Sequence, residues 1–287
     1  GDNILFWYSL LVSVVIFSFR SFVGPGLVWK DDFIPRHPLY SYFSLFTWNP
    51  LEHGGTLNDD LSNALLNSLR AFLSSIFGLE LVSKVYVVGV VALCAVLMFK
   101  ALVGFRDLFN QSRNYMVCFI GALFFTVNPW VTARILSGHY FILSSYAFTP
   151  LFLYYLVQYL DVDAEKYGFI KCSFLFSLVS MTSNHGFIMS LFLSFIITLW
   201  YLIIFKKGVV ILKASLVFII SLLINSFWIF PTLNMVFSGV RNISFFQEIS
   251  TSLSVNANWV NTIRLLGYFW TPYNQEIYTS GGLFYKV

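Results

Sequence analysis

Long hydrophobic blocks alternate with short polar segments along most of the chain. A helix that crosses the ~30 Å hydrocarbon core of a bilayer needs about 20 apolar residues. Several blocks reach that length, and two shorter ones pair with a following block as the arms of helical hairpins. The pattern predicts an all-α, polytopic transmembrane bundle of about seven spans, at residues 4–23, 82–103, 116–127, 140–160, 169–181, 187–205 and 209–230.

The polar segments between the blocks have different characters. The two hairpins turn at residues 128–139 and 182–186, and their short first arms predict irregular backbone that lines a protein-enclosed cavity. Residues 61–78 carry apolar side chains at helical spacing among Ser, Asn and Arg. This third segment is therefore expected to be an amphipathic helix lying in the membrane interface.

Pro231 is expected to close the last span and to divide the chain in two. A transmembrane module is predicted at residues 1–231, with a long structured first loop at 24–60. Residues 232–287 are polar and aromatic, and they predict outward-facing loops and interfacial helices. The chain starts without Met, and we therefore expect its N-terminus to be trimmed or the segment to come from a longer protein.

Composition supports a membrane protein, because 58% of the 287 residues are hydrophobic and 10% are charged. A soluble domain carries about 25% charged residues, so this chain cannot cover the surface of a soluble globule. Disorder and a disulfide scaffold are excluded on the same grounds. Cys94, Cys118 and Cys172 lie inside apolar blocks without a CxxC pairing and are expected to be core residues.

The basic residues indicate how the chain is oriented in the bilayer. One set of short loops and helix ends holds eight of them, whereas the two hairpin corners on the opposite side hold only Arg134. Basic short loops are typically cytoplasmic. The first loop, both corners and the C-terminal segment are therefore expected to face outward from a cell membrane. The net charge of +4 needs no nucleic-acid partner, since it follows from the basic set: Lys100, Arg106, Arg113, Lys166, Lys171, Lys206, Lys207 and Lys213.

The outward side then collects the polar residues that could carry chemistry. Asp31 and Asp32 are adjacent acids near the membrane, where charge is costly unless water, a cation or a base accompanies it. They are predicted either to function or to be ordinary solvated loop charges. Side chains that could contact a substrate in the same loop are Trp29, Arg36, His37, Trp48, Glu52 and His53.

The two hairpin corners add three candidates, one arginine and two histidines. Arg134 is either a snorkelling contact to lipid headgroups or a phosphate ligand, because a guanidinium matches phosphate oxygens bidentately. His139 and His185 lie at the ends of apolar helices at the same predicted depth, where histidine is also common as an interfacial residue. If the helices bring these side chains toward Asp31 and Asp32, one membrane-level pocket would hold acid, imidazole and guanidinium.

The chain resembles the GT-C superfamily of integral membrane glycosyltransferases, and within it the polytopic arabinofuranosyltransferases and YfhO-like membrane proteins. The similar stretches are WKDDFIPRHPLYSYFSLFTWNPLEHGG at 29–55, LSNALLNSLRAFLSSIFGL at 61–79, NPWVTARILSGHYFILSSYAFTPLFLYYL at 128–156 and the weaker NTIRLLGYFW at 261–270. Enzymes of that superfamily place a carboxylate motif in the first outer loop. The acids here are adjacent instead of separated by one residue, so either can be the catalytic one.

The resemblance implies transfer of a sugar from a polyprenyl-phosphate donor to an outward-facing glycan, lipid or protein acceptor. Asp31 or Asp32 would be the general base, and the other acid could hold a divalent cation such as Mg or Mn. Arg134, with His139 or His185, would stabilise the leaving phosphate. Two alternatives remain open: a lipid-linked glycan flippase or other transporter, and a non-catalytic membrane assembly subunit.

Overall fold

The computed structural model describes residues 3–20, 48–49, 56–57, 61–112, 114–136, 138–161, 167–206 and 208–237. Within them the chain is helical except for a short antiparallel pair, β1 (Trp48–Asn49) and β2 (Thr56–Leu57), in which Trp48 lies opposite Leu57. A single 3₁₀ turn, η2 (Leu61–Asn63), leads into α3. The helices are α1 (Ile4–Ser18), α3 (Ala64–Phe77), α4 (Leu79–Leu108), α5 (Tyr115–Thr126), α6 (Pro129–Leu136), α7 (Tyr140–Asp161), α8 (Gly168–Thr182), α9 (Asn184–Phe205) and α10 (Val209–Phe237).

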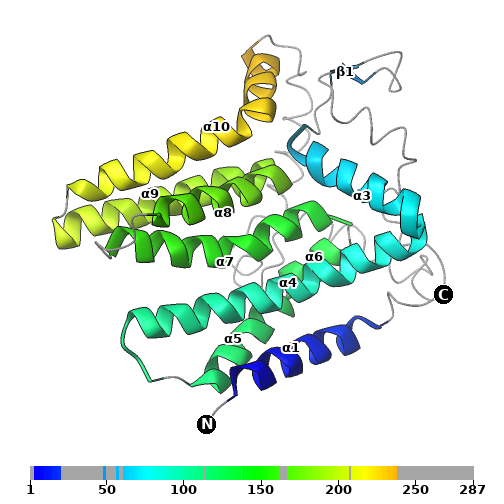
Figure 1. The fold of residues 1–287 in the computed structure, drawn as a ribbon, viewed down its shortest axis with the longest axis horizontal. Helices are drawn as coiled ribbons and strands as arrows, with labels where there is room; N and C mark the ends of the chain where they lie inside the picture. Colours follow the sequence, from blue (N-terminus) through cyan, green and yellow to red (C-terminus); the bar gives the residue numbers. More distant parts are fainter. Residues whose placement is uncertain are drawn as a thin grey trace, which may run out of the picture.

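Helix α7 is the centre of the bundle, with α4 on one side and α8 on the other (Figure 1). Its first turns pack through Leu143 into a core shared with α1, α4 and α5. Its later turns pack through Phe152 and Leu156 into a second core shared with α8, α9 and α10. A helix that is apolar on all sides is expected to be buried in this way.

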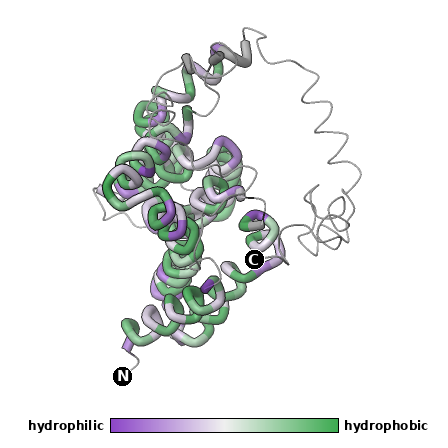
Figure 2. The backbone as a smooth tube through the Cα atoms, turned by 90° about the vertical axis from the view of Figure 1, so that its right-hand side faces the viewer, coloured by the Kyte–Doolittle hydropathy of each residue, from purple (hydrophilic) through white to green (hydrophobic). Residues whose placement is uncertain are grey.

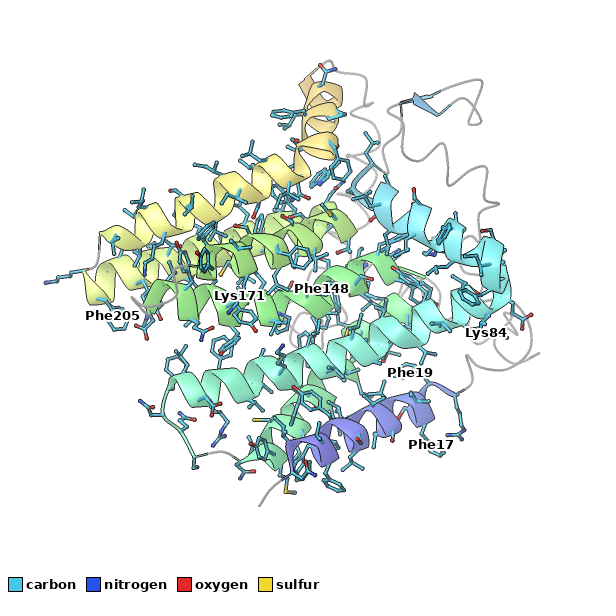
Figure 3. The ribbon with its side chains drawn as sticks, in the orientation of Figure 1. Phe17, Phe19, Lys84, Phe148, Lys171 and Phe205 are labelled. Carbon is cyan, nitrogen blue, oxygen red and sulfur yellow. The ribbon has the colours of Figure 1, made fainter. Side chains whose placement is uncertain are left out.

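The helix ends divide the bundle into two opposite ends. One end contains the C-termini of α4, α7 and α9 and the N-termini of α5, α8 and α10 (Figure 1). The other end contains α3, α6 and the break between α8 and α9. Lys84 near the start of α4 and Phe205 at the end of α9 accordingly lie at opposite ends of the molecule (Figure 3). The two hairpin corners therefore share one end, as the alternation of the hydrophobic blocks requires.

Four helices are long and apolar enough to cross a membrane: α4, α7, α9 and α10. The pair α5 and α6 forms a fifth candidate, bent by 46° at its break. Helices α1 and α8 are apolar but have only 15 residues each, because α1 ends at Ser18 and α8 at Thr182. About seven full spans are thus not confirmed, whereas the helical membrane character is evident from the hydrophobic residues along the helices (Figure 2).

Three predicted helix limits are wrong. Residues 129–136 form α6 instead of irregular backbone, and α9 begins at Asn184, so Ser183 alone separates it from α8. Helix α10 also continues through Pro231 to Phe237 and turns near its C-terminal end (Figure 1). Pro231 removes the backbone donor of the Phe227 carbonyl, four residues earlier, and membrane helices tolerate such a loss. The Thr232 hydroxyl donates to the next carbonyl, that of Trp228, at 2.7 Å.

The amphipathic helix predicted at residues 61–78 is present as η2 and α3. Leu61 and Ala64 are buried, and Asn67 lies on the same side of the helix. The opposite face exposes a stripe of large apolar side chains: Leu65, Leu69, Phe72 and Ile76. Arg70 is held to the bundle, because its guanidinium lies 5.1 Å from the Tyr86 ring and 5.6 Å from the Phe141 ring. The position of this helix at a membrane surface stays a prediction.

Candidate anion site at the helix corners

Asn128 starts the first corner by capping α6. Its Oδ1 accepts from the Val131 backbone at 3.0 Å, and Pro129 occupies the first helical position, where a missing N–H costs nothing. The amide of Asn128 donates to the Phe125 carbonyl at 2.7 Å and also contacts the Tyr146 hydroxyl at 3.3 Å. One buried side chain thus joins the end of α5, the start of α6 and the face of α7.

Aromatic rings continue this connection from α7 to Arg134. The Tyr146 ring stacks on Phe125 with centroids 4.0 Å apart, and its hydroxyl donates to the Phe125 carbonyl at 3.1 Å. Trp130 packs on the same tyrosine at 4.9 Å. The Arg134 guanidinium lies 5.1 Å from the Trp130 ring, a cation–π contact that fixes its direction.

The end of α6 then returns the chain so that His139 meets Arg134. Gly138 adopts φ 77°, its N–H donates to the Ile135 carbonyl, and the His139 N–H donates to the Arg134 carbonyl at 2.9 Å. These two bonds and a left-handed glycine form a Schellman motif. The side chains also meet, with Arg134 Nη1 2.9 Å from His139 Nδ1. Arginine can only donate, so Nδ1 accepts and the neutral ring carries its proton on Nε2.

His185 comes to the same place from the second corner. It is the second residue of α9, whose N-terminus is capped by the Ser183 side chain through the Gly186 N–H at 3.4 Å. Arg134 and His139 both act electrostatically on the His185 imidazole. The structure therefore places Arg134 and His139 in direct contact, with His185 close enough to both for an electrostatic interaction.

The described carboxylates lie away from these three residues. Glu80 pairs with Lys84 in the first turns of α4. Asp107 and Asp161 lie at the C-terminal ends of α4 and α7, at the other end of the bundle. The Arg134 guanidinium is a planar cation, and such groups bind phosphate oxygens well, so the corner suits an anionic ligand.

An apolar cavity of about 340 Å³ is linked to Arg134 through the rings of Tyr146 and Trp130, although Arg134, His139 and His185 do not line it. Helices α4, α5, α7 and α9 line it, and Phe125 and Tyr146 belong both to its wall and to the corner. Its other lining residues are apolar side chains and one threonine, among them Met98, Leu102, Pro150, Leu153 and Ile197. A guanidinium joined to an apolar cavity through aromatic rings suits an amphiphile that has an anionic head and a hydrocarbon tail.

The candidate residues of the first loop fall outside the described part of the chain, Trp48 excepted, whose backbone pairs in β1. Their proximity to the cationic corner stays a prediction. Among the described residues no group of three His, Cys, Asp or Glu side chains could hold a metal ion. The predicted divalent cation involves the first-loop acids, so it also stays a prediction. The residues concerned are Trp29, Asp31, Asp32, Arg36, His37, Glu52 and His53.

Sequence reasoning missed the residues that build the corner. Asn128, Tyr146 and Gly186 were not candidates, although they hold the cationic side chains in place. Asn before Pro is a recognised helix-start signal and could have predicted α6. Gly138, four residues after Arg134, is a typical C-terminal helix signal. Tyr146 and Gly186 act through contacts between helices, which leave no such local signal.

Comparison of the chain with known protein families, with curated proteins and with solved structures finds no match. The functional argument therefore depends on the geometry of the corner and on the chemistry of its residues.

Proposed function

We propose that this protein is a membrane glycosyltransferase that moves a sugar from a polyprenyl-phosphate donor to an outward-facing glycan, lipid or protein acceptor. The observation that supports it is the contact of Arg134 with His139 at the first corner, with aromatic rings joining Arg134 to an apolar cavity between the helices. In this proposal the three side chains bind the donor phosphate at the outer face of a cell membrane. The lipid tail lies among the helices.

The proposed reaction is a displacement at the anomeric carbon. The acceptor hydroxyl oxygen forms a bond to that carbon, and the bond from the carbon to the phosphate oxygen breaks. The hydroxyl proton passes to Asp31 or Asp32 as general base, and the polyprenyl phosphate leaves with the electron pair. Positive charge at the corner stabilises the negative charge that develops on the leaving phosphate. The second acid is available to a divalent cation or to an oriented water.

Transfer from a labelled polyprenyl-phosphate sugar in membranes tests the proposal. Arg134→Gln removes the charge but keeps a polar side chain, and we expect transfer to fall by about 100-fold, as for other groups that stabilise a transition-state charge. Arg106→Gln is the matched control. Arg106 lies in the last turn of α4, at the end of the bundle opposite Arg134, and it donates to the Ser112 carbonyl. Asp31→Asn and Asp32→Asn, made singly, identify the base.

Three results would contradict the proposal in different ways. Undiminished transfer in both Asp variants would remove these acids from the mechanism. Equal losses in the Arg134 and Arg106 variants would remove the corner from it. Donor binding that depends on Arg134, in a protein with no transfer at all, would favour the flippase or assembly-subunit alternative.

A further inference from the structure

Gly186 lies at a close contact between α9 and α7. A Cβ atom at this position would stand 1.5 Å from the Ser145 Oγ and 2.6 Å from the Ser145 Cβ, so no side chain fits. The Val179 carbonyl oxygen of α8 would be 3.2 Å away on another side. The Gly186 backbone does not have a positive φ, so its conformation does not require glycine. The close spacing between the helices does require it.

Local helix stability does not explain this glycine. In a helix, Gly is less favourable than Ala by about 0.5–1 kcal/mol because it loses more backbone entropy. Close helix contacts through small residues are, however, a common way for membrane helices to pack. Ser190, one turn along α9, continues the same small face and is fully buried.

Ser145 is matched to this close approach. It is 1% exposed, and its hydroxyl oxygen has no hydrogen-bond partner among the described residues. That oxygen faces the Gly186 backbone, where a Cα–H···O contact gives weak compensation. On the other side the Val179 carbonyl oxygen of α8 would lie 3.2 Å from a Cβ atom on Gly186, and the Ser183 side chain caps the Gly186 N–H. The first turn of α9 thus packs closely against both α7 and α8.

We infer that Gly186 and Ser145 are positioning residues whose contact sets the distance of His185 from Arg134 and His139. His185 is the covalent neighbour of Gly186, and it moves with the first turn of α9. Ser145 lies six residues after His139, about 9 Å farther along α7. A change in the spacing at this contact therefore changes the spacing at the cationic corner.

The inference concerns the same site as the proposed function, and its test has two readouts. The first is binding of labelled polyprenyl phosphate to the full chain in nanodiscs. The second needs no ligand: nitrogen NMR follows the titration midpoint of the His185 imidazole with and without Arg134→Gln. The change caused by that substitution measures the electrostatic coupling between the two side chains.

Gly186→Ala forces a methyl group into the contact, and we expect about ten-fold weaker binding of polyprenyl phosphate and a smaller coupling. Gly89→Ala is the matched control, because a Cβ atom at Gly89 in α4 meets nothing within 4 Å. The double variant Ser145→Gly with Gly186→Ala vacates the space for the new methyl group. It should recover most of the coupling and of the binding.

Unchanged coupling in Gly186→Ala would overturn the inference. So would a double variant that does not fold or that couples no better than Gly186→Ala, because Ser145 would then not set the spacing. If the coupling behaves as expected but the unsubstituted protein does not bind polyprenyl phosphate, the proposed function fails and the positioning role stands.

Discussion

Asn128 should contribute more to stability than an ordinary helix cap, because it is buried and bonds three elements. Asn128→Ala removes the cap of α6, worth about 1 kcal/mol, and the short bond to the Phe125 carbonyl, worth about another 1 kcal/mol. The long contact to Tyr146 adds little. The Phe125 carbonyl keeps the Tyr146 hydroxyl as a donor, so no orphaned acceptor adds to the cost. We expect a loss of about 2 kcal/mol in the free energy of unfolding.

Asn114 is the matched control for this substitution. It caps α5 through the Val117 N–H at 3.2 Å in the same way, but it is exposed. Asn114→Ala should therefore cost only about 0.5–1 kcal/mol. Asn128→Ser keeps a capping oxygen and removes the amide donors, so it separates the two contributions and should cost about 1 kcal/mol.

Equilibrium unfolding in mixed micelles, followed by circular dichroism, measures these differences. The reasoning is refuted if Asn128→Ala costs no more than Asn114→Ala. It is also refuted if the Asn128→Ser variant is as stable as the unsubstituted protein, because the buried amide donors would then contribute nothing to stability.

Two further predictions concern other parts of the bundle. Asn225→Ala leaves the buried Trp228 indole N–H without its acceptor at 2.9 Å and should cost about 2 kcal/mol of folding stability. In a double-mutant cycle, Trp228→Phe should remove most of that cost, because no indole N–H is then left unpaired. Additive losses in the cycle would contradict this prediction. For topology, a cysteine at the exposed Thr132 should react with an impermeant maleimide from outside the cell and one at Gln111 only after permeabilisation. Labelling of both positions from the same side would refute the orientation.

The sequence by itself determined that the chain is a helical membrane protein and roughly where its helices lie. Hydrophobic block length and spacing are local properties, so α4, α7 and α9 are found close to their expected positions. The alternation of blocks also placed both corners at one end of the bundle. The prediction of irregular backbone at residues 129–136 was wrong although a local signal was present. Asn128 and Pro129 are typical of a helix start, and they do begin α6.

Other features depended on contacts that no local pattern reveals. The number of full spans is not confirmed, because α1 ends at Ser18 within its predicted block and α8 has only 15 residues. The meeting of Arg134, His139 and His185 required α6, α7 and α9 to pack at particular distances. Those distances are set by pairs such as Gly186 and Ser145, which lie 41 positions apart in the sequence. Close packing between helices is a property of matched surfaces, and only the tertiary structure shows which surfaces match.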